Sequence, residues 1–180
     1  MLAVVTDPTQ WLDACEASAS NLRTSSMLPR FCCAILIDPQ GRLLMELRPP
    51  SGGAPPRRLT CFGGSREPAE PPLFAVRREL REELALTEAQ VEELGLTTDP
   101  VVKLSVERPR RPDKPRRLIK LTAWFYAGRA PDPELIRTEP GHEAVWLSWD
   151  ELREDPRLAA WHRVVLTGWH DRAPLVTIHE

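Results

Sequence analysis

The alternation of apolar and polar residues predicts short strands over most of the chain. Residues 31–37 form a nearly continuous apolar run, residues 38–41 have the composition of a turn, and residues 42–47 alternate as the second strand of a hairpin would. Further segments have the composition of strands: residues 59–62, 101–106, 118–127 and 144–147. A sheet that contains a buried antiparallel pair is therefore the predicted centre of the fold.

Helical periodicity appears between and after these strands. Pro71 and Pro72 suit the first turn of a helix, and apolar residues then recur at helical spacing to give a buried stripe: Leu73, Val76, Leu80 and Leu84. Four further helices are predicted from caps, breakers and apolar spacing: residues 8–20, 87–95, 149–155 and 157–169. This order of strands and helices indicates an α+β fold, arranged as an α/β/α sandwich.

The composition fits one domain without a large electrostatic field. The 180 residues have a formal net charge of −2, which favours neither nucleic acid nor an anionic membrane as a partner. The basic segment 107–117 contains no aromatic residue to stack on bases, so a solvated loop is favoured over a nucleic-acid site, with a phosphate-gripping flap as an alternative. We expect residues 1–29 to form an N-terminal extension, packed or acting as a dimer arm or lid, and residues 30–180 to form the domain.

Four cysteines are present, Cys15, Cys32, Cys33 and Cys61, and their spacing matches no metal site. The adjacent pair would point to opposite faces of a strand. The sequence shows neither a signal peptide nor a long apolar run, so we expect reduced thiols in a cytoplasmic protein that does not enter membranes.

Three carboxylates crowd one side of the predicted helix that follows Pro72. Glu79, Glu82 and Glu83 occupy positions i, i+3 and i+4, where like charges repel. One interpretation is a solvated face, because arginines are interleaved with the glutamates. The other is a site for hard divalent cations, with Mg²⁺ favoured, since all-oxygen ligands suit that ion and leave room for substrate phosphates.

The spacing around this helix separates the two interpretations. Gly64 is followed by five residues and Glu70, then by seven residues and Arg78-Glu79-Leu80, one residue, Glu82-Glu83, one residue, and Ala85-Leu86. This pattern resembles the signature of the Nudix hydrolase family, and every fixed position matches except the last glycine, which is Ala85. The signature covers about 24 residues, and the order of the flanking strands agrees with the family over roughly residues 30–155.

The resemblance assigns a role to each residue of the signature. It implies that Glu79, Glu82 and Glu83 bind the catalytic metal, with the backbone carbonyl near Gly63 as a further ligand. It also implies that Gly64, Glu70 and Arg78 form a structural brace in which the arginine fixes the loop against the helix. Because alanine disfavours the left-handed conformation of a helix C-cap, we expect the helix either to run on past Ala85 or to end without that cap.

A second acidic segment precedes the strand at 144–147. Some family members place a further glutamate in this loop as metal ligand or general base, and the resemblance makes Glu139 and Glu143 the candidates here, each with a solvated loop carboxylate as the alternative. Glu79 is the other candidate for the base, and the sequence does not choose among them.

The resemblance implies a mixed sheet between helices and an Mg²⁺-dependent hydrolase, with Mn²⁺ as a substitute. Its substrate would be a small-molecule nucleoside diphosphate linked to another moiety, with ADP-ribose or another sugar nucleotide slightly favoured and a homodimer left open. The alternative is a Nudix-like domain that binds a nucleotide without cleaving it, and the complete set of box carboxylates favours catalysis. An isomerase branch that uses a cysteine is disfavoured, because the surroundings of Cys61 do not match it.

Overall fold

The computed structural model describes residues 30–50, 57–109 and 118–179. Within these ranges the elements follow one another in the order β1 (Arg30–Ile37), β2 (Leu43–Arg48), β3 (Arg58–Thr60), β4 (Gly63–Ser65), α2 (Pro72–Leu84), α3 (Glu88–Glu93), β5 (Val102–Pro109), β6 (Leu118–Arg129), the 3₁₀ helix η2 (Pro133–Leu135), β7 (Glu143–Leu147), α4 (Trp149–Glu154), α5 (Ala160–His170) and β8 (Leu175–His179). The helix predicted over residues 8–20, together with Cys15, lies outside the described residues.

A mixed sheet forms the middle layer of the fold. Its main path runs β3-β2-β1-β6-β5-β8, with β4 paired to β1 and β7 paired to β2. The strands β1 and β6 are parallel, as are β5 and β8, whereas the hairpin β1–β2 and the pair β5–β6 are antiparallel. The predicted mixed sheet and the predicted hairpin are both confirmed.

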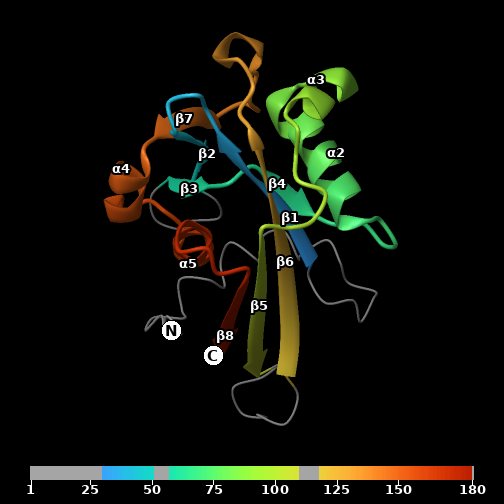
Figure 1. The fold of residues 1–180 in the computed structure, drawn as a ribbon, viewed down its shortest axis with the longest axis vertical. Coiled ribbons are helices and arrows are strands. Elements are labelled where there is room, and N and C mark those ends of the chain that lie inside the picture. The colour runs from blue at the N-terminus through green and yellow to red at the C-terminus, as the bar shows by residue number, and fades with distance from the viewer. Residues whose placement is uncertain (1–29, 51–56, 110–117, 180) are drawn as a thin grey trace.

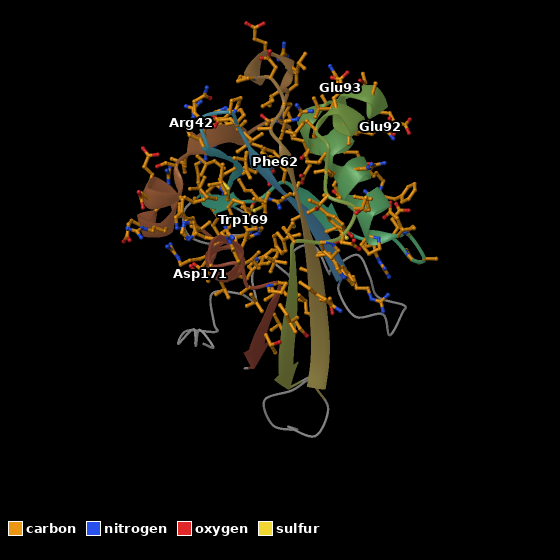
Figure 2. All side chains as sticks on the ribbon, in the orientation of Figure 1. Arg42, Phe62, Glu92, Glu93, Trp169 and Asp171 are labelled. Carbon is orange, nitrogen blue, oxygen red and sulfur yellow. The ribbon has the colours of Figure 1, made fainter. Side chains whose placement is uncertain are left out.

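Helices cover both faces of this sheet, as Figure 1 shows with α2 and α3 on one side and α4 and α5 on the other. The pleat of β1 sends Cys32 toward the α2 side and Cys33 toward the α5 side, as the sequence predicted. Phe62 is fully buried on the α2 side and lies in the middle of the molecule in Figure 2. Two separate apolar clusters therefore hold the helices against the sheet, which is the predicted α/β/α sandwich of an α+β fold.

Three details differ from the prediction. Helix α5 begins at Ala160 instead of 157, because the backbone of Arg157 to Ala159 is hydrogen-bonded to Leu59 of β3 and is extended there. The edge strand β8 was missed, since its five residues follow the last predicted helix without a hairpin signal. Helix α2 ends at Leu84 with Ala85 in the left-handed conformation at φ 53°, so the cap is present despite the alanine.

No helix among the described residues is both long enough and apolar enough to cross a membrane.

Candidate active site

Helix α2 places the three predicted carboxylates beside the sheet. Its apolar stripe is buried against β1 and β6 through Val76, Leu80 and Leu84, and this packing fixes which way the rest of the helix faces. Glu79 and Glu83 then lie toward β4, with 14% of the Glu79 side chain exposed, whereas Glu82 is 58% exposed. The carboxylates therefore form a graded set that runs from the interior to the solvent.

Two glycines of β4 allow the strand to approach this helix closely. The backbone of Gly63 has φ 132°, and a Cβ there would overlap the carbonyl group of Cys32 on β1. At Gly64, a Cβ would overlap the carboxylate of Glu79. The amide of Gly63 donates a hydrogen bond of 2.7 Å to Glu83 Oε2. The glycine pair thus brings backbone polar groups within reach of the helix carboxylates.

Arg78 connects the loop before the helix to the helix itself. Its Nε and Nη2 donate to the two oxygens of Glu70 at 3.0 and 3.1 Å, and Nη2 also donates to the carbonyl of Ser65 at 3.0 Å. Its Nη1 donates to Glu79 Oε1 at 2.9 Å and to Glu82 Oε2 at 3.2 Å. One guanidinium fork therefore contacts the loop and two of the helix carboxylates at once.

The pKa values of the carboxyl groups differ across this short distance. Hydrogen bonds from Arg78 hold the pKa of Glu70 below its usual range. Burial raises the pKa of Glu79, against the opposing effect of Arg78. Burial, followed by the charge of Glu46, raises the pKa of Glu83 to about 8. Glu70 is thus a stably charged partner of the arginine, whereas Glu83 is a buried acid with like charges nearby, a combination that is frequent at functional sites.

Glu46 on β2 is a site residue that the sequence analysis missed. It is 1% exposed, and it pairs across the sheet with Thr60, whose hydroxyl donates to Glu46 Oε2 at 3.1 Å. The ring nitrogen Nδ1 of His142 contacts Glu46 Oε1. The available signal was a carboxylate at an inward position of an otherwise apolar strand, which is uncommon unless the charge has partners.

The loop before β7 holds the two further glutamates that the resemblance made candidates. The carboxylate of Glu143 is 59% exposed and accepts a hydrogen bond of 2.6 Å from Arg57. Glu139 is exposed, and its side chain has no hydrogen bond within the described part of the chain. His142, between these two, is the loop residue that reaches the buried carboxylate of Glu46. The structure therefore groups Glu79, Glu82, Glu83, Arg78 and Glu70 together, and places Glu139 and Glu143 at the surface of the neighbouring loop.

The donor set suits a hard divalent cation by its chemistry. Among the described residues no three His, Cys, Asp or Glu side chains already lie in the arrangement of a metal cluster. Each of the three helix carboxylates nevertheless uses only one oxygen in the contacts above, which leaves a second oxygen on Glu79, Glu82 and Glu83 for a ligand bond. Buried carboxylates with raised pKa values are stabilised by a nearby cation, so these residue types fit Mg²⁺ or Mn²⁺.

Cys61 lies on the other face of the sheet from α2. It is 2% exposed within the apolar cluster of α5, and burial raises the pKa of its thiol to about 12. A thiol in this environment is a poor acid or nucleophile, so the disfavoured isomerase interpretation has no support at the site.

The chain is similar to known proteins in both sequence and structure. A family model described as the NUDIX domain matches residues 27–168. The fold is similar to that of a MutT protein from Methanosarcina mazei Go1, with 17% sequence identity and a TM-score of 0.60 over 82% of this chain and 97% of that one. A MutT Nudix hydrolase from Burkholderia pseudomallei has 26% identity and a TM-score of 0.51 over 79% of this chain and 98% of that one.

A third similar structure is the dihydroneopterin triphosphate pyrophosphohydrolase of E. coli, with 19% identity and a TM-score of 0.54 over 77% of this chain and 95% of that one. No match was found among curated proteins. The matched region of the family model contains the whole of the site described above.

Proposed function

The chain belongs to the Nudix hydrolase family, and we propose that it hydrolyses the diphosphate linkage of a nucleoside diphosphate joined to a second moiety, with ADP-ribose or another sugar nucleotide slightly favoured. One observation carries this proposal. Glu79 and Glu83 of α2 lie against Gly63 and Gly64 of β4, and Arg78 contacts Glu79, Glu82 and the preceding loop in one network. The name of the E. coli relative shows that a similar fold supports pyrophosphohydrolase chemistry.

Glu79, Glu82 and Glu83, with the carbonyl of Gly63, are the residues we propose to hold Mg²⁺, for which Mn²⁺ would substitute. When bound, such an ion neutralises charge on the diphosphate and lowers the pKa of a ligated water. Arg78 orients Glu79 and Glu82 from one side, and the Gly63 amide orients Glu83 from the other. Because the two anchors belong to strand β4 and helix α2, the three side chains are held in place before substrate binds.

A carboxylate must accept the proton of the attacking water, and we propose Glu79 or Glu139 for this role. Glu79 is largely buried beside Gly64, and burial raises its pKa, which makes it a better proton acceptor than an exposed carboxylate. Glu139 carries no competing side-chain hydrogen bond among the described residues. Glu143 remains a weaker candidate, since Arg57 already occupies its carboxylate.

The three described cysteines are free and buried, which supports a reducing compartment such as the cytoplasm. The substrate is a small molecule in this proposal, and a homodimer remains a prediction that oligomeric-state measurements would check.

The test is release of phosphate, after addition of phosphatase, from a panel of ADP-ribose, sugar nucleotides, dinucleoside polyphosphates and nucleoside triphosphates. Each compound is incubated with Mg²⁺, with Mn²⁺ and with EDTA. We expect metal-dependent cleavage of one class and none in EDTA. Cleavage that persists in EDTA would contradict the metal assignment. Nucleotides that raise the melting temperature without being cleaved would favour a binding domain instead.

A further inference from the structure

The loop that joins η2 to β7 is fastened to the rest of the domain from two directions. Arg57, just before β3, donates to Glu143 at 2.6 Å and to the carbonyl of Gly141 at 3.1 Å. On the other side His142 reaches β2 through its contact with Glu46. The amide of His142 also donates to the carbonyl of Glu139 at 3.0 Å, which closes the loop on itself. The position of the His142 ring is therefore fixed by backbone and side-chain contacts together.

Glu46 is an unusual residue to find inside this sheet. It lies on the same face of β2 as Leu44, which packs in the α2 cluster, whereas Met45 and Leu47 face the α5 cluster. Its two oxygens have separate partners, His142 on Oε1 and Thr60 on Oε2, and Arg48 Nε lies 3.6 Å from Oε2. A buried carboxylate costs free energy even when it is paired, and an apolar residue would fill this position more cheaply.

The pair formed by Glu46 and His142 lies next to the candidate active site. Thr60, opposite Glu46 in the register of β2 and β3, precedes Gly63 of the β4 turn by three residues. Glu46 faces the side of the sheet that α2 covers, and Glu83 of α2 reaches the sheet there by accepting from the amide of Gly63. The face of the sheet beside α2 therefore continues from the helix carboxylates to His142.

The imidazole of His142 has one nitrogen occupied and one available. Nδ1 contacts Glu46, whereas Nε2 has no hydrogen bond within the described residues, and 14% of the side chain is exposed. A carboxylate on Nδ1 fixes the orientation of the ring, and an imidazolium donates from both of its nitrogens. Such a donor complements an anionic substrate in a site whose other side chains are mostly carboxylates.

We propose that His142 is a substrate-binding residue whose Nε2 donates to a phosphate oxygen of the bound nucleoside diphosphate, and that Glu46 is the positioning residue that orients it. This inference rests on the proposed function for its ligand class. It adds a loop histidine and a buried strand carboxylate to the site that the helix carboxylates define.

Two substitutions separate the roles of the ring nitrogens. His142→Asn places an amide near the position of Nδ1, so it can keep the contact with Glu46 while it removes Nε2. His142→Gln extends to the position of Nε2 instead. His170→Asn is the matched control, because His170 is half exposed at the end of α5 on the other face of the sheet. Binding of the non-hydrolysable α,β-methylene-ADP with Mg²⁺ is measured by calorimetry for each variant.

We expect His142→Asn to weaken this binding by about tenfold, as the loss of a charged hydrogen bond does. His142→Gln should remain within about threefold of the wild type, and His170→Asn should not change the affinity. The melting temperatures of His142→Asn and His170→Asn should stay close to that of the wild type, whereas His142→Gln should melt lower because it gives up the contact with buried Glu46. If His142→Asn binds the analogue as tightly as the wild type does, the proposal is wrong. The proposal is also wrong if the wild type hydrolyses a compound of the panel but does not bind the analogue.

The role of Glu46 is tested with Glu46→Gln alone and combined with His142→Asn. If Glu46 acts through His142, each variant raises KM more than it lowers kcat, and the double variant is no worse than His142→Asn. A merely structural Glu46 would change the melting temperature and leave KM unaltered. The analogue is never cleaved, so its binding tests the role of His142 even if no compound of the panel is hydrolysed. The absence of hydrolysis would then contradict the proposed function without contradicting the role of His142.

Discussion

Among the buried groups with strongly shifted pKa values are His162 on the α5 side of the central sheet and Glu83 on the α2 side, and these two have different partners. On the α5 side, burial lowers the pKa of His162 to about 3. On the α2 side, burial and the charge of Glu46 raise the pKa of Glu83 to about 8. Both side chains are thus driven toward their neutral forms by burial and by a nearby like charge, which is Arg48 for His162 and Glu46 for Glu83.

The neighbours show which of the two is part of a site. His162 accepts a hydrogen bond of 3.2 Å from the amide of Cys61 and packs edge-on against Phe125, so a neutral ring satisfies its environment. Glu83 accepts a hydrogen bond from the amide of Gly63 and lies among further carboxylates, Glu46 and Glu79, whose charges raise its pKa. A shifted pKa alone therefore does not identify a site, whereas a cluster of carboxylates with oxygens left free for ligand bonds suits a cation.

The largest effect is expected when the carboxylate of Glu83 is removed. Glu83→Gln should reduce kcat/KM at least about a hundredfold, since it deletes one proposed metal ligand while it keeps the size of the side chain. The measurement is steady-state hydrolysis of the substrate found in the panel. Glu93→Gln is the control, because Glu93 projects from α3 at the edge of the molecule (Figure 2). Equal activity of Glu83→Gln and the control would remove Glu83 from the site.

The same variant also tests how the burial of Glu83 affects the stability of the fold. In the folded wild type the pKa of Glu83 lies above the ordinary value of 4.5, so the native state binds more protons than the unfolded chain between about pH 4.5 and 8. Stability in EDTA should therefore fall as pH rises through that window, and Glu83→Gln should not show this fall. Thermal melts at pH 5 and pH 8 check the expectation. Parallel curves for the two proteins would contradict it.

Removal of the Arg78 fork should have the next largest effect. Arg78→Lys keeps the charge but cannot contact Glu70, Ser65 and Glu79 together, so we expect a loss of about 2 kcal/mol in the free energy of unfolding and a reduced kcat. Urea denaturation measures the first quantity. The control is Arg77→Lys, whose partner Glu92 is 4.0 Å away and exposed. An unfolding free energy within about 0.5 kcal/mol of the wild type would show that the fork is not a structural brace.

On the α5 side, the buried His162 should lower the free energy of unfolding as the pH falls, and not as it rises. The folded pKa of His162 is depressed below 6.5, so the unfolded chain binds the extra proton and stability falls as pH drops from about 6.5 toward 3. The slope from this residue is about 1.4 kcal/mol per pH unit within that window. His162→Gln should flatten the slope while activity at neutral pH remains. The test compares urea midpoints of both proteins at pH 7 and pH 5, and equal slopes would contradict the burial argument.

Much of the fold and of the helix side of the site could be predicted from local patterns. The spacing of Val76, Leu80 and Leu84 predicted α2 and its buried face, and the capping boxes at Thr87 and Ser148 predicted where α3 and α4 begin. These signals depend on residues within a few positions of one another. The carboxylates of α2 were predictable for the same reason.

The residues that were missed depend on contacts between distant segments. His142 and Glu46 are 96 positions apart, and they meet only because β7 pairs with β2. The late start of α5 is likewise set by the hydrogen bonds between Leu59 and the residues before Ala160. The outward position of Glu143 likewise depends on Arg57, a residue 86 positions away that donates to its carboxylate. Pairing across the sheet, and not local propensity, decided these positions.

The smallest effect is expected at the end of α2, where Ala85 holds a conformation that alanine disfavours. Its φ of 53° supplies the left-handed cap two residues after Glu83. A residue with a Cβ is less stable than glycine in this conformation by about 1 kcal/mol. Ala85→Gly should therefore raise the free energy of unfolding by up to about 1 kcal/mol, reduced by the greater freedom of glycine in the unfolded chain. The reciprocal change, Gly95→Ala, replaces a glycine with φ 59° and open space around it, so strain is its only structural cost. Urea denaturation should show opposite signs for the two variants.

A destabilised Ala85→Gly would mean that packing of the alanine methyl outweighs the backbone strain. Side-chain contacts, more than the cap, would then hold the end of the helix that carries Glu82 and Glu83.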